Sequence, residues 1–366
     1  MGVNARYADW ISTFEPSAIF MVDKNISSPY IDVANRCRLT MPKVLHLGPF
    51  ETRGGMRTVM KTLVEHPPET WHAEALATHC EGHVLRKFSR YFSSMKSFKR
   101  ICRSSNRPDI VHIHAASDWS WRRKMKFLGY ALKLNIPCVV HLHSGNMYAW
   151  LMQGKSQQGA SSRAQTFKKI ASHHLVQVVA LNDHWKTTFE SFGPSVEAVS
   201  NPVDPKFCVS DVVERTPGKL LLLARNDPVK NHQIAVDVVN ILESEISLWM
   251  TGVTTHQSEK IHSLGWITDE EVLFHLRSAE ILLIPSAFEG QPMVALEALA
   301  CGTKVLASQH VPEIPGVVRV DGETPQQWAK AIQNVLDDER TPTLDEQFSI
   351  ASVQKRWEEV YNSLLQ

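Results

Sequence analysis

The stretch from Glu280 to Ser308 constrains the fold more than any other part of this chain. It opens with the run ILLIP (281–285), which is apolar throughout and does not alternate, as is typical of a parallel strand covered on both faces. Pro292 then stands at a predicted first helical position, apolar residues follow at helical spacing, and Gly302 closes the helix. A strand, a loop and a helix in this order predict an α/β fold.

Two glutamates follow that strand, Glu289 in the loop and Glu297 within the predicted helix, with seven residues between them. In open α/β sheets ligands bind beyond the carboxyl ends of the strands, and the N–H groups at a helix start suit a phosphate. The plain alternative is an exposed loop acid and a solvated helix residue. Glu297, however, has Ala and Leu on both sides, close to an apolar face where a carboxylate needs a hydrogen-bond partner. Both glutamates are therefore candidates to face one bound molecule.

Charge divides the chain into two unlike halves. Residues 1–200 hold 26 Lys and Arg against 14 Asp and Glu, residues 201–366 hold 13 against 24, and the formal net charge of the whole is +1. A shift of that size predicts a domain boundary near residue 200 and a first half that prefers anionic partners. A chain of 366 residues is long enough for two cores. The predicted divisions are an N-terminal extension of unknown role (1–40), a first domain (41–203), a second domain (204–345) and a C-terminal helix (346–366).

Nothing in the composition indicates a secreted chain or a membrane span. The six cysteines have no CxxC or other ligand spacing, which is typical of reduced, buried thiols. No apolar run reaches the roughly 18 residues that a span needs, and acids interrupt the region where a signal peptide would lie. We expect a cytoplasmic protein.

The first half has its own α/β pattern, which begins at KVLHLG (43–48). Gly54 and Gly55 follow, and a glycine pair either lets the backbone approach a ligand closely or simply makes a tight turn. Two later strand patterns, DIVHIHAA (109–116) and IPCVVHLHSG (136–145), each carry His-x-His near the end. A zinc site is one interpretation of these histidines, and hydrogen-bonded strand histidines are the other. The absence of a carboxylate or cysteine immediately beside them favours the second.

A basic segment interrupts this pattern. Residues 86–103 carry seven Lys and Arg and no acid, with Phe, Tyr and Met interleaved, and residues 119–126 form a second basic and aromatic cluster. One interpretation is an amphipathic surface that lies on an anionic membrane. Another is a solvated helix face with basic side chains over core aromatics. Nucleic acid is a third, but no recognised binding motif supports it, and we expect no nucleic-acid partner.

Together the motifs resemble those of the retaining GT-B glycosyltransferases, specifically glycosyltransferase family 4. The resemblance rests on the E-x7-E pair after a strand ending in Pro-Ser, the Gly-Gly loop, the DIVHIH strand, and Arg225 and Lys230 after the strand KLLLLA. It covers roughly residues 43–362. It implies an α/β fold of two Rossmann-like domains facing across a cleft, with a C-terminal helix that crosses back to the first domain. It also implies sugar transfer from a nucleotide-sugar donor to a hydroxyl of a glycan or lipid-linked acceptor, with retention at the anomeric carbon.

The resemblance also implies roles for individual residues. Glu289 binds hydroxyls of the donor sugar and Glu297 binds the ribose hydroxyls. Arg225 and Lys230 bind the diphosphate, because fixed cations stabilise the charge that it gains as it departs. Further donor contacts are assigned to Gly54, Gly55, Trp266, Ile267, Gly290, Gln291, Pro292 and Met293. The catalytic candidates are Arg225, Lys230, Glu289 and His143, the last facing the donor sugar with His114 nearby.

No Asp-x-Asp triplet occurs in the chain, and with two cations to take the charge we expect no metal and no cofactor. Peripheral attachment to the inner face of a membrane is expected if the basic segment is a lipid-binding surface. Two other functions stay open at this stage. One is a nucleotide-sugar epimerase on the same fold, and the other is a catalytically silent scaffold that binds a sugar nucleotide.

Overall fold

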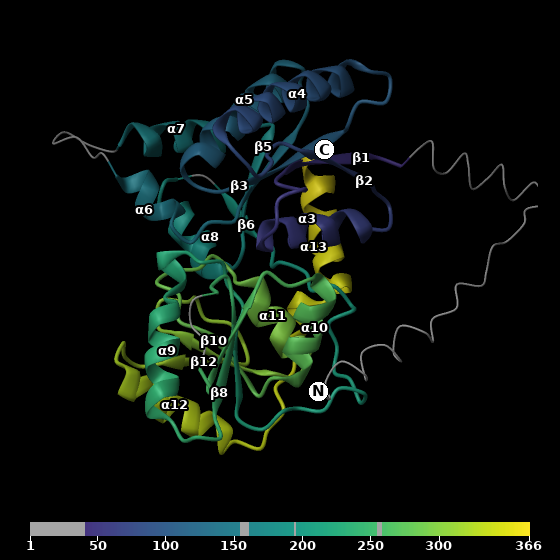
Figure 1. Ribbon diagram of the computed structural model, residues 1–366. Helices are drawn as coiled ribbons and strands as arrows, with labels where there is room; N and C mark the ends of the chain where they lie inside the picture. The colour runs from purple at the N-terminus through teal and green to yellow at the C-terminus, as the bar shows by residue number, and fades with distance from the viewer. Residues whose placement is uncertain (1–40, 154–160, 194, 255–257) are drawn as a thin grey trace, which may run out of the picture. The chain divides into compact units, whose positions relative to one another are not determined.

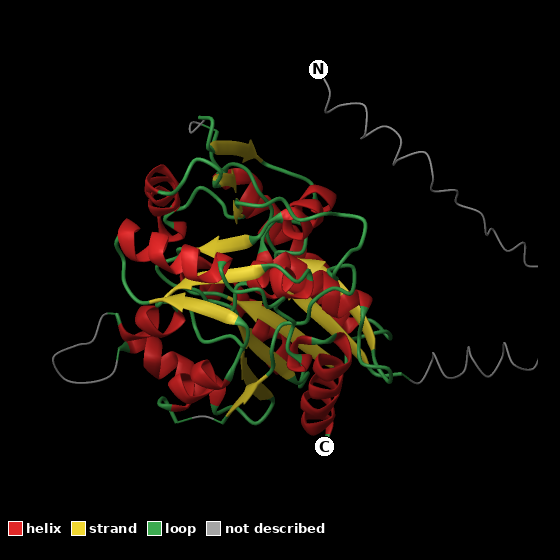
Figure 2. Cartoon of the chain, turned by 90° about the horizontal axis from the view of Figure 1, so that it is seen from below, coloured by secondary structure: helices red, strands yellow, loops and turns green. Residues whose placement is uncertain are grey.

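The computed structural model describes residues 41–153, 161–193, 195–254 and 258–366, so the predicted N-terminal extension lies outside the described residues. The chain from Pro42 onward is one compact unit, and it contains two six-stranded sheets whose strands pair in parallel (Figure 1). A second view shows the strands of both sheets lying between helices (Figure 2). The predicted α/β fold of two Rossmann-like domains is confirmed.

The first sheet has the strand order β2-β1-β3-β4-β5-β6. Its strands are β1 (Lys43–Gly48), β2 (His72–Ala77), β3 (Ile110–Ala115), β4 (Cys138–Leu142), β5 (Val176–Ala180) and β6 (Val196–Ala198). The helices of this lobe are α3 (Gly55–Glu65), α4 (Val84–Arg103), α5 (Asp118–Lys133), α6 (Met147–Met152), α7 (Ser162–Ala171) and α8 (Asp183–Glu190). Every residue of β1, β3 and β4 is buried, as expected of strands covered on both faces.

The second sheet has the order β12-β11-β10-β7-β8-β9. Its strands are β7 (Lys219–Leu222), β8 (Ser247–Thr251), β9 (Ile261–Gly265), β10 (Ile281–Ile284), β11 (Lys304–Ser308) and β12 (Val317–Val320). The helical segments are η1 (Pro228–Lys230), α9 (His232–Ile241), α10 (Asp269–Ser278), α11 (Met293–Ala300), α12 (Pro325–Leu336), η2 (Glu346–Phe348) and α13 (Ile350–Leu365). The chain runs from β7 outward through β8 and β9, and then returns to β10 on the other side of β7. The reversal places a crevice between the loops that follow β7 and β10, where open α/β sheets bind ligands.

Helix starts follow the local sequence closely. A capping box begins α10: the Thr268 hydroxyl accepts from the backbone N–H of Glu271, and the Glu271 carboxylate accepts from that of Thr268. The prediction that Pro292 is the first helical residue is off by one position. Pro292 has ψ 113°, an extended backbone, so it is the N-cap and α11 begins at Met293.

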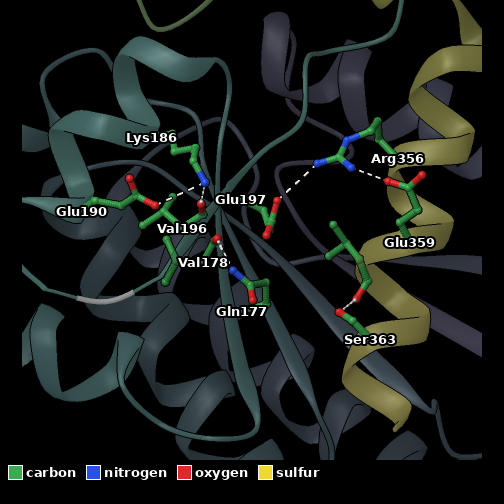
Figure 3. Close-up of polar contacts among 10 residues, drawn as sticks. Gln177, Val178, Lys186, Glu190, Val196, Glu197, Arg356, Glu359 and Ser363 are labelled. Atoms are coloured by element: carbon green, nitrogen blue, oxygen red, sulfur yellow. Dashed lines mark hydrogen bonds and ion pairs between the residues drawn. The ribbon is translucent and has the colours of Figure 1, made fainter.

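Helix α13 crosses back to the first lobe, as predicted (Figure 1). Trp357 and Tyr361 on this helix are fully buried and lie against histidines of β3 and β4. At the rim, Arg356 Nη2 lies 3.2 Å from the carboxylate of Glu197 on β6 and also pairs with Glu359 on its own helix (Figure 3). Because two large aromatic side chains of this terminal helix are buried against the first lobe, the hydrophobic effect holds the two lobes together.

Candidate functional site

A cavity of about 650 Å³ lies between the two lobes, beyond the carboxyl ends of β1, β7 and β10. All the residues predicted to contact a donor line it. They are Gly54, Gly55, His143, Arg225, Lys230, Trp266, Ile267, Glu289, Gly290, Gln291, Pro292, Met293 and Glu297. Residues up to about 240 positions apart in the sequence thus line one cleft, where they could contact a single bound molecule.

Lys230 and Glu289 form the central ion pair of the cleft. The Lys230 ammonium lies 2.5 Å from the Glu289 carboxylate, and both side chains are mostly buried. Their loops are held together by the Ala287 N–H, which donates to the Val229 carbonyl at 2.8 Å. The fold therefore fixes the carboxylate after β10 beside the ammonium after β7. A polyanion entering the cleft would share the ammonium with Glu289.

Arg225 is the more available of the two cations. Its guanidinium is 3.5 Å from the carboxylate of Asp227, and its side chain is 61% exposed. An exposed pair at this distance contributes little energy. The guanidinium is therefore free to move onto an anionic ligand at the mouth of the cleft, where Trp266 and Ile267 also lie.

Glu297 is buried on α11 and lines the same cleft. Burial raises the pKa of its carboxyl to about 7, since the charged form loses its water there, while Lys206 opposes this shift and Asp269 adds to it. A carboxyl with this pKa can accept or donate a hydrogen bond at neutral pH. The prediction that Glu297 lies close to the apolar face of its helix is confirmed.

Two glycines let the lobes approach each other beside the ion pair. A Cβ atom on Gly290 would lie 2.7 Å from the carbonyl oxygen of His143, and one on Gly145 would lie 2.2 Å from that of Glu289. Only glycine fits at either position, because real Cβ atoms do not approach backbone so closely. Trp185 of the first lobe also donates from Nε1 to the Gly290 carbonyl at 3.0 Å. His143 and Glu289 are thus placed across the cleft by backbone contact.

Gln291 acts at the seam between the lobes. Its side-chain oxygen accepts from the backbone N–H of Asn201 at 2.7 Å, and its amide nitrogen donates to the Leu181 carbonyl at 3.3 Å. The predicted donor contact of this residue is therefore limited to its backbone, since the side chain is occupied in joining the lobes.

Four buried histidines and the half-buried His143 form a layer on one face of the first sheet, where His46 of β1 is in register with His112, and His114 with His141. They belong to two hydrogen-bonded runs. Tyr361 Oη lies 2.8 Å from Nδ1 of His112, whose Nε2 is 3.2 Å from Nδ1 of His141. Nδ1 of His46 lies 2.9 Å from Nε2 of His114, and Nδ1 of His114 lies 2.9 Å from Nε2 of His143. The second run ends at the cleft, so His143 is held from behind by His114.

Among the described residues, two groups of three of these histidines bring ring nitrogens within 4.8 Å of one another. Around a tetrahedral zinc with Zn–N bonds of ~2.05 Å, ligand nitrogens are about 3.3 Å apart. The separations of 2.9, 2.9 and 3.2 Å in this layer are ordinary hydrogen-bond lengths, and two of the three are shorter than a zinc site would give. The geometry favours the hydrogen-bonded interpretation of these residues.

The sequence predicted only part of this layer. The four histidines of the two His-x-His patterns were predicted to be hydrogen-bonded, and His114 and His143 were also assigned to the cleft, whereas His46 and the role of Tyr361 were not foreseen. The signal was available in the alternation of histidine with apolar residues along KVLHLG and DIVHIH, which places the histidines on one face. What the alternation leaves open is the register between strands, which only pairing determines.

The basic surface predicted on residues 86–103 and 119–126 is confirmed in part. Residues 86–103 lie within the single helix α4, on which Leu85, Phe88 and Phe92 are exposed beside the basic side chains. In the second cluster Trp119 is exposed, but Trp121 and Lys124 are buried, so the prediction is wrong for these two. They lie on the side of α5 that packs on the sheet. Of the helices in the described parts of the chain, none is both long and apolar enough to span a bilayer.

Comparison with known proteins agrees with the site geometry. Residues 217–338 match the family model described as glycosyl transferases group 1, and residues 56–207 match the one described as Glycosyltransferase Family 4. The chain belongs to glycosyltransferase family 4. Each of its two lobes is matched by one of the models, which fits the predicted resemblance.

Curated relatives of this family 4 chain match it over limited stretches. D-inositol 3-phosphate glycosyltransferase of Paenarthrobacter aurescens is 29% identical over 147 residues, 33% of this chain and 36% of that protein. MMP α-(1→4)-mannosyltransferase of Mycolicibacterium hassiacum is 42% identical over 66 residues, 18% of this chain and 16% of that protein. The chain thus aligns with between 16% and 36% of the length of these two relatives.

Solved structures match over a larger share. HepE of Anabaena in complex with UDP-glucose has a TM-score of 0.65 at 14% identity, over 88% of this chain and 99% of that one. Sucrose-phosphate synthase of Thermosynechococcus elongatus has the same TM-score of 0.65, also at 14% identity, over 88% of this chain and 99% of that one. At these identities the likeness concerns the fold, and it confirms the GT-B arrangement.

The buried histidines predict a loss of stability in acid. Burial lowers the pKa of His46 and of His143 to about 3, and lowers that of the other three well below the usual 6.5. Below pH 6.5 the unfolded chain therefore binds more protons than the folded one, and stability falls as the pH drops from 6.5 toward 3. Each histidine contributes up to about 1.4 kcal/mol per pH unit.

Denaturant unfolding from pH 7 to pH 5 measures this slope. We expect His46→Asn to flatten the dependence of unfolding free energy on pH relative to the unsubstituted protein. The control is His83→Asn, at an exposed histidine that is the N-cap residue of α4. Equal slopes for both variants would show that the buried histidines are not kept neutral by the fold.

Proposed function

We propose that this protein transfers a sugar from a nucleotide-sugar donor to an acceptor hydroxyl, with retention at the anomeric carbon. The observation that carries the proposal is the convergence of Arg225, Lys230, Glu289 and Glu297 on one cleft at the strand reversal of the second sheet. The amide groups at the start of α11 line the same cleft. Two cations, a row of amides and two carboxylates are the groups that a sugar diphosphate needs. The UDP-glucose named for the HepE structure supports this donor class.

The proposed roles combine the family resemblance with the positions of these residues in the cleft. Arg225 and Lys230 hold the diphosphate and stabilise the charge that it gains when the bond to the anomeric carbon breaks. Glu289 lies beside Lys230 and accepts hydrogen bonds from sugar hydroxyls, while Glu297, deeper in the cleft, holds the ribose. The acceptor oxygen attacks from the face that the diphosphate leaves, and the departing phosphate oxygen takes the acceptor proton. His143 faces the donor sugar from the first lobe.

The acceptor we propose is a glycan or a lipid-linked glycan, reached from a membrane surface. Exposed Leu85, Phe88 and Phe92 on α4 stand among Lys and Arg side chains, and Trp119 at the start of α5 is 71% exposed. Apolar side chains that insert among lipid headgroups, ringed by cations, are typical of a helix lying on an anionic membrane. This interpretation is favoured over a solvated face because the rings of Phe88 and Phe92 are exposed, whereas Phe98 packs in the core.

Removal of either member of the central ion pair tests the donor site. We expect Lys230→Ala and Glu289→Ala each to lower turnover by ~100-fold or more, the scale of a lost transition-state charge contact. The donor is first chosen by the thermal shift that each of a panel of nucleotide-sugars produces. Turnover is then followed as transfer to sugar acceptors and as donor hydrolysis. Lys330→Ala, at an exposed lysine on α12, is the matched control.

Near-normal turnover in either variant would remove the role assigned to that residue. Product analysis covers the two other functions. Release of an epimerised sugar without an acceptor would indicate an epimerase, and binding without turnover on any acceptor would indicate a scaffold.

Metal independence is a separate prediction. Because two side-chain cations neutralise the diphosphate, we expect dialysis against EDTA to leave the transfer rate unchanged. Metal analysis of the purified protein accompanies the assay, since the histidine layer is the place where the described residues offer grouped ligands. A rate that collapses in EDTA and returns with added Mg²⁺ or Mn²⁺ would contradict the prediction.

Vesicle flotation tests the membrane surface. We expect binding to phosphatidylglycerol vesicles at low salt that weakens as salt screens the basic residues. The double variant Phe88→Ser with Phe92→Ser should bind several-fold more weakly, since both exposed rings are lost. Val318→Ser, at an exposed apolar residue of the second lobe, is the control. No binding of the unsubstituted protein even at low salt would reject the membrane surface.

A further inference from the structure

Lys124 is a buried ammonium for which the donor chemistry has no use. It lies on α5, and only 4% of the residue is exposed. Its Nζ donates to the hydroxyl of Ser120 at 3.0 Å, and no carboxylate of the described residues lies within ion-pair distance of it. A buried charge without a counter-charge is strongly destabilising, so buried lysines are normally paired.

Burial makes the charged form of Lys124 less favourable. Burial, and secondly the charge of Arg123, lower the pKa of Lys124 to about 7. A methionine would fill the same space without this penalty. An anion beside Lys124 would stabilise its charged form, and the described residues place no carboxylate there.

The surroundings show from where an anion would come. Ser120, whose hydroxyl oxygen accepts the hydrogen bond from Lys124, lines the cleft together with His79 and Thr52. Nδ1 of His79 is 3.2 Å from the Thr52 hydroxyl. The charge of Lys124 also lowers the pKa of both His79 and His143, so the ammonium lies close behind this wall. We name Thr52, His79, Ser120 and Lys124 the first-lobe corner.

The first-lobe corner carries mostly donors and positive charge. Arg123 and Lys87 act on His79 in the same sense as Lys124, and Glu81 is the acid that opposes them. The Glu81 carboxylate already accepts from the backbone N–H of Arg53. An oxyanion placed against Ser120 would find hydroxyl donors in front and a buried positive charge directly behind.

We propose that the first-lobe corner binds a phosphate-type oxyanion carried by the acceptor, with Ser120 as hydrogen-bond donor and Lys124 as counter-charge. The acceptor assignment rests on the proposed function. The proposed diphosphate contacts, Arg225 and Lys230, come from the second lobe, and the corner stands on the opposite wall of the same cleft. The oxyanion orients the acceptor, so Lys124 is a binding residue and takes no part in bond breaking.

The probe is sulfate, which does not titrate between pH 6 and 8. Its binding is measured by calorimetry with the donor site filled by the nucleoside diphosphate that the thermal-shift panel selects. We expect Lys124→Met to weaken sulfate binding by about ten-fold or more, because one charge-assisted contact is lost. Lys126→Met, at an exposed lysine two positions along α5, should bind as the unsubstituted protein does.

The pH dependence separates this role from a merely structural one. As Lys124 loses its proton between pH 6 and 8, sulfate binding should weaken in the unsubstituted protein and change less in Lys124→Met. The pKa of His79 is also lowered, and because His79 is present in both proteins, the difference between them reports the charge of Lys124. Ser120→Ala, which removes a single oxygen, provides a variant with little risk to folding and should also weaken binding.

The proposal would be overturned if folded Lys124→Met bound sulfate with the same affinity and the same pH dependence as the unsubstituted protein. Nucleoside diphosphate binding is recorded alongside, and we expect it to be unchanged. If the unsubstituted protein bound no nucleoside diphosphate, the proposed function would instead be overturned. The sulfate measurements would still test the first-lobe corner. Displacement of sulfate by glycerol phosphate identifies a soluble source of the oxyanion, and displacement only by phosphatidylglycerol vesicles identifies a lipid headgroup.

Discussion

The cleft depends on the close approach of two backbones, one after β4 and the other after β10. Gly145 faces the carbonyl of Glu289 and Gly290 faces that of His143, with no room for a side chain at either glycine. This crossing sets the distance between the histidine of the first lobe and the carboxylate of the second. The indole of Trp185 fixes the same point by a hydrogen bond to Gly290. A larger residue at either glycine would push the lobes apart and separate groups that are useful only together.

Polar groups behind the cleft share one electrostatic condition, because low dielectric makes each of them expensive to charge. These groups differ in how the cost of a buried charge is avoided or offset. The histidines stay neutral and hydrogen-bond to one another, as His114 does to both His46 and His143. Glu289 is paired internally with Lys230. Lys124 has a hydroxyl but no counter-charge among the described residues, which makes it the group whose partner has to arrive from outside.

Much of this could be read from the sequence, and the failures have a common physical cause. The apolar run of β10, the glycine before α3 and the cations after β7 are local patterns, and local patterns fixed the lining of the cleft. Side-chain direction on α5 was not predictable, because a helix in which aromatic and basic residues alternate does not show which stripe packs on the sheet. Lys124 was therefore placed on the surface, although it is buried. The pairing of His46 with His112 depends on strand register, which the chain reveals only when folded.

The two halves of the chain have opposite charges, which suits the two walls of the cleft to different ligands. An acidic second half repels polyanions in general, so only a ligand that reaches Arg225 and Lys230 and matches the amides of α11 overcomes that repulsion. The repulsion thereby adds selectivity to the donor site. The basic first half works in the other direction, since it attracts anionic surfaces and anionic acceptors before any specific contact forms. In the proposal made above, the first-lobe corner, with its charge buried, then distinguishes an acceptor that carries an oxyanion at the correct position from one that is merely negative.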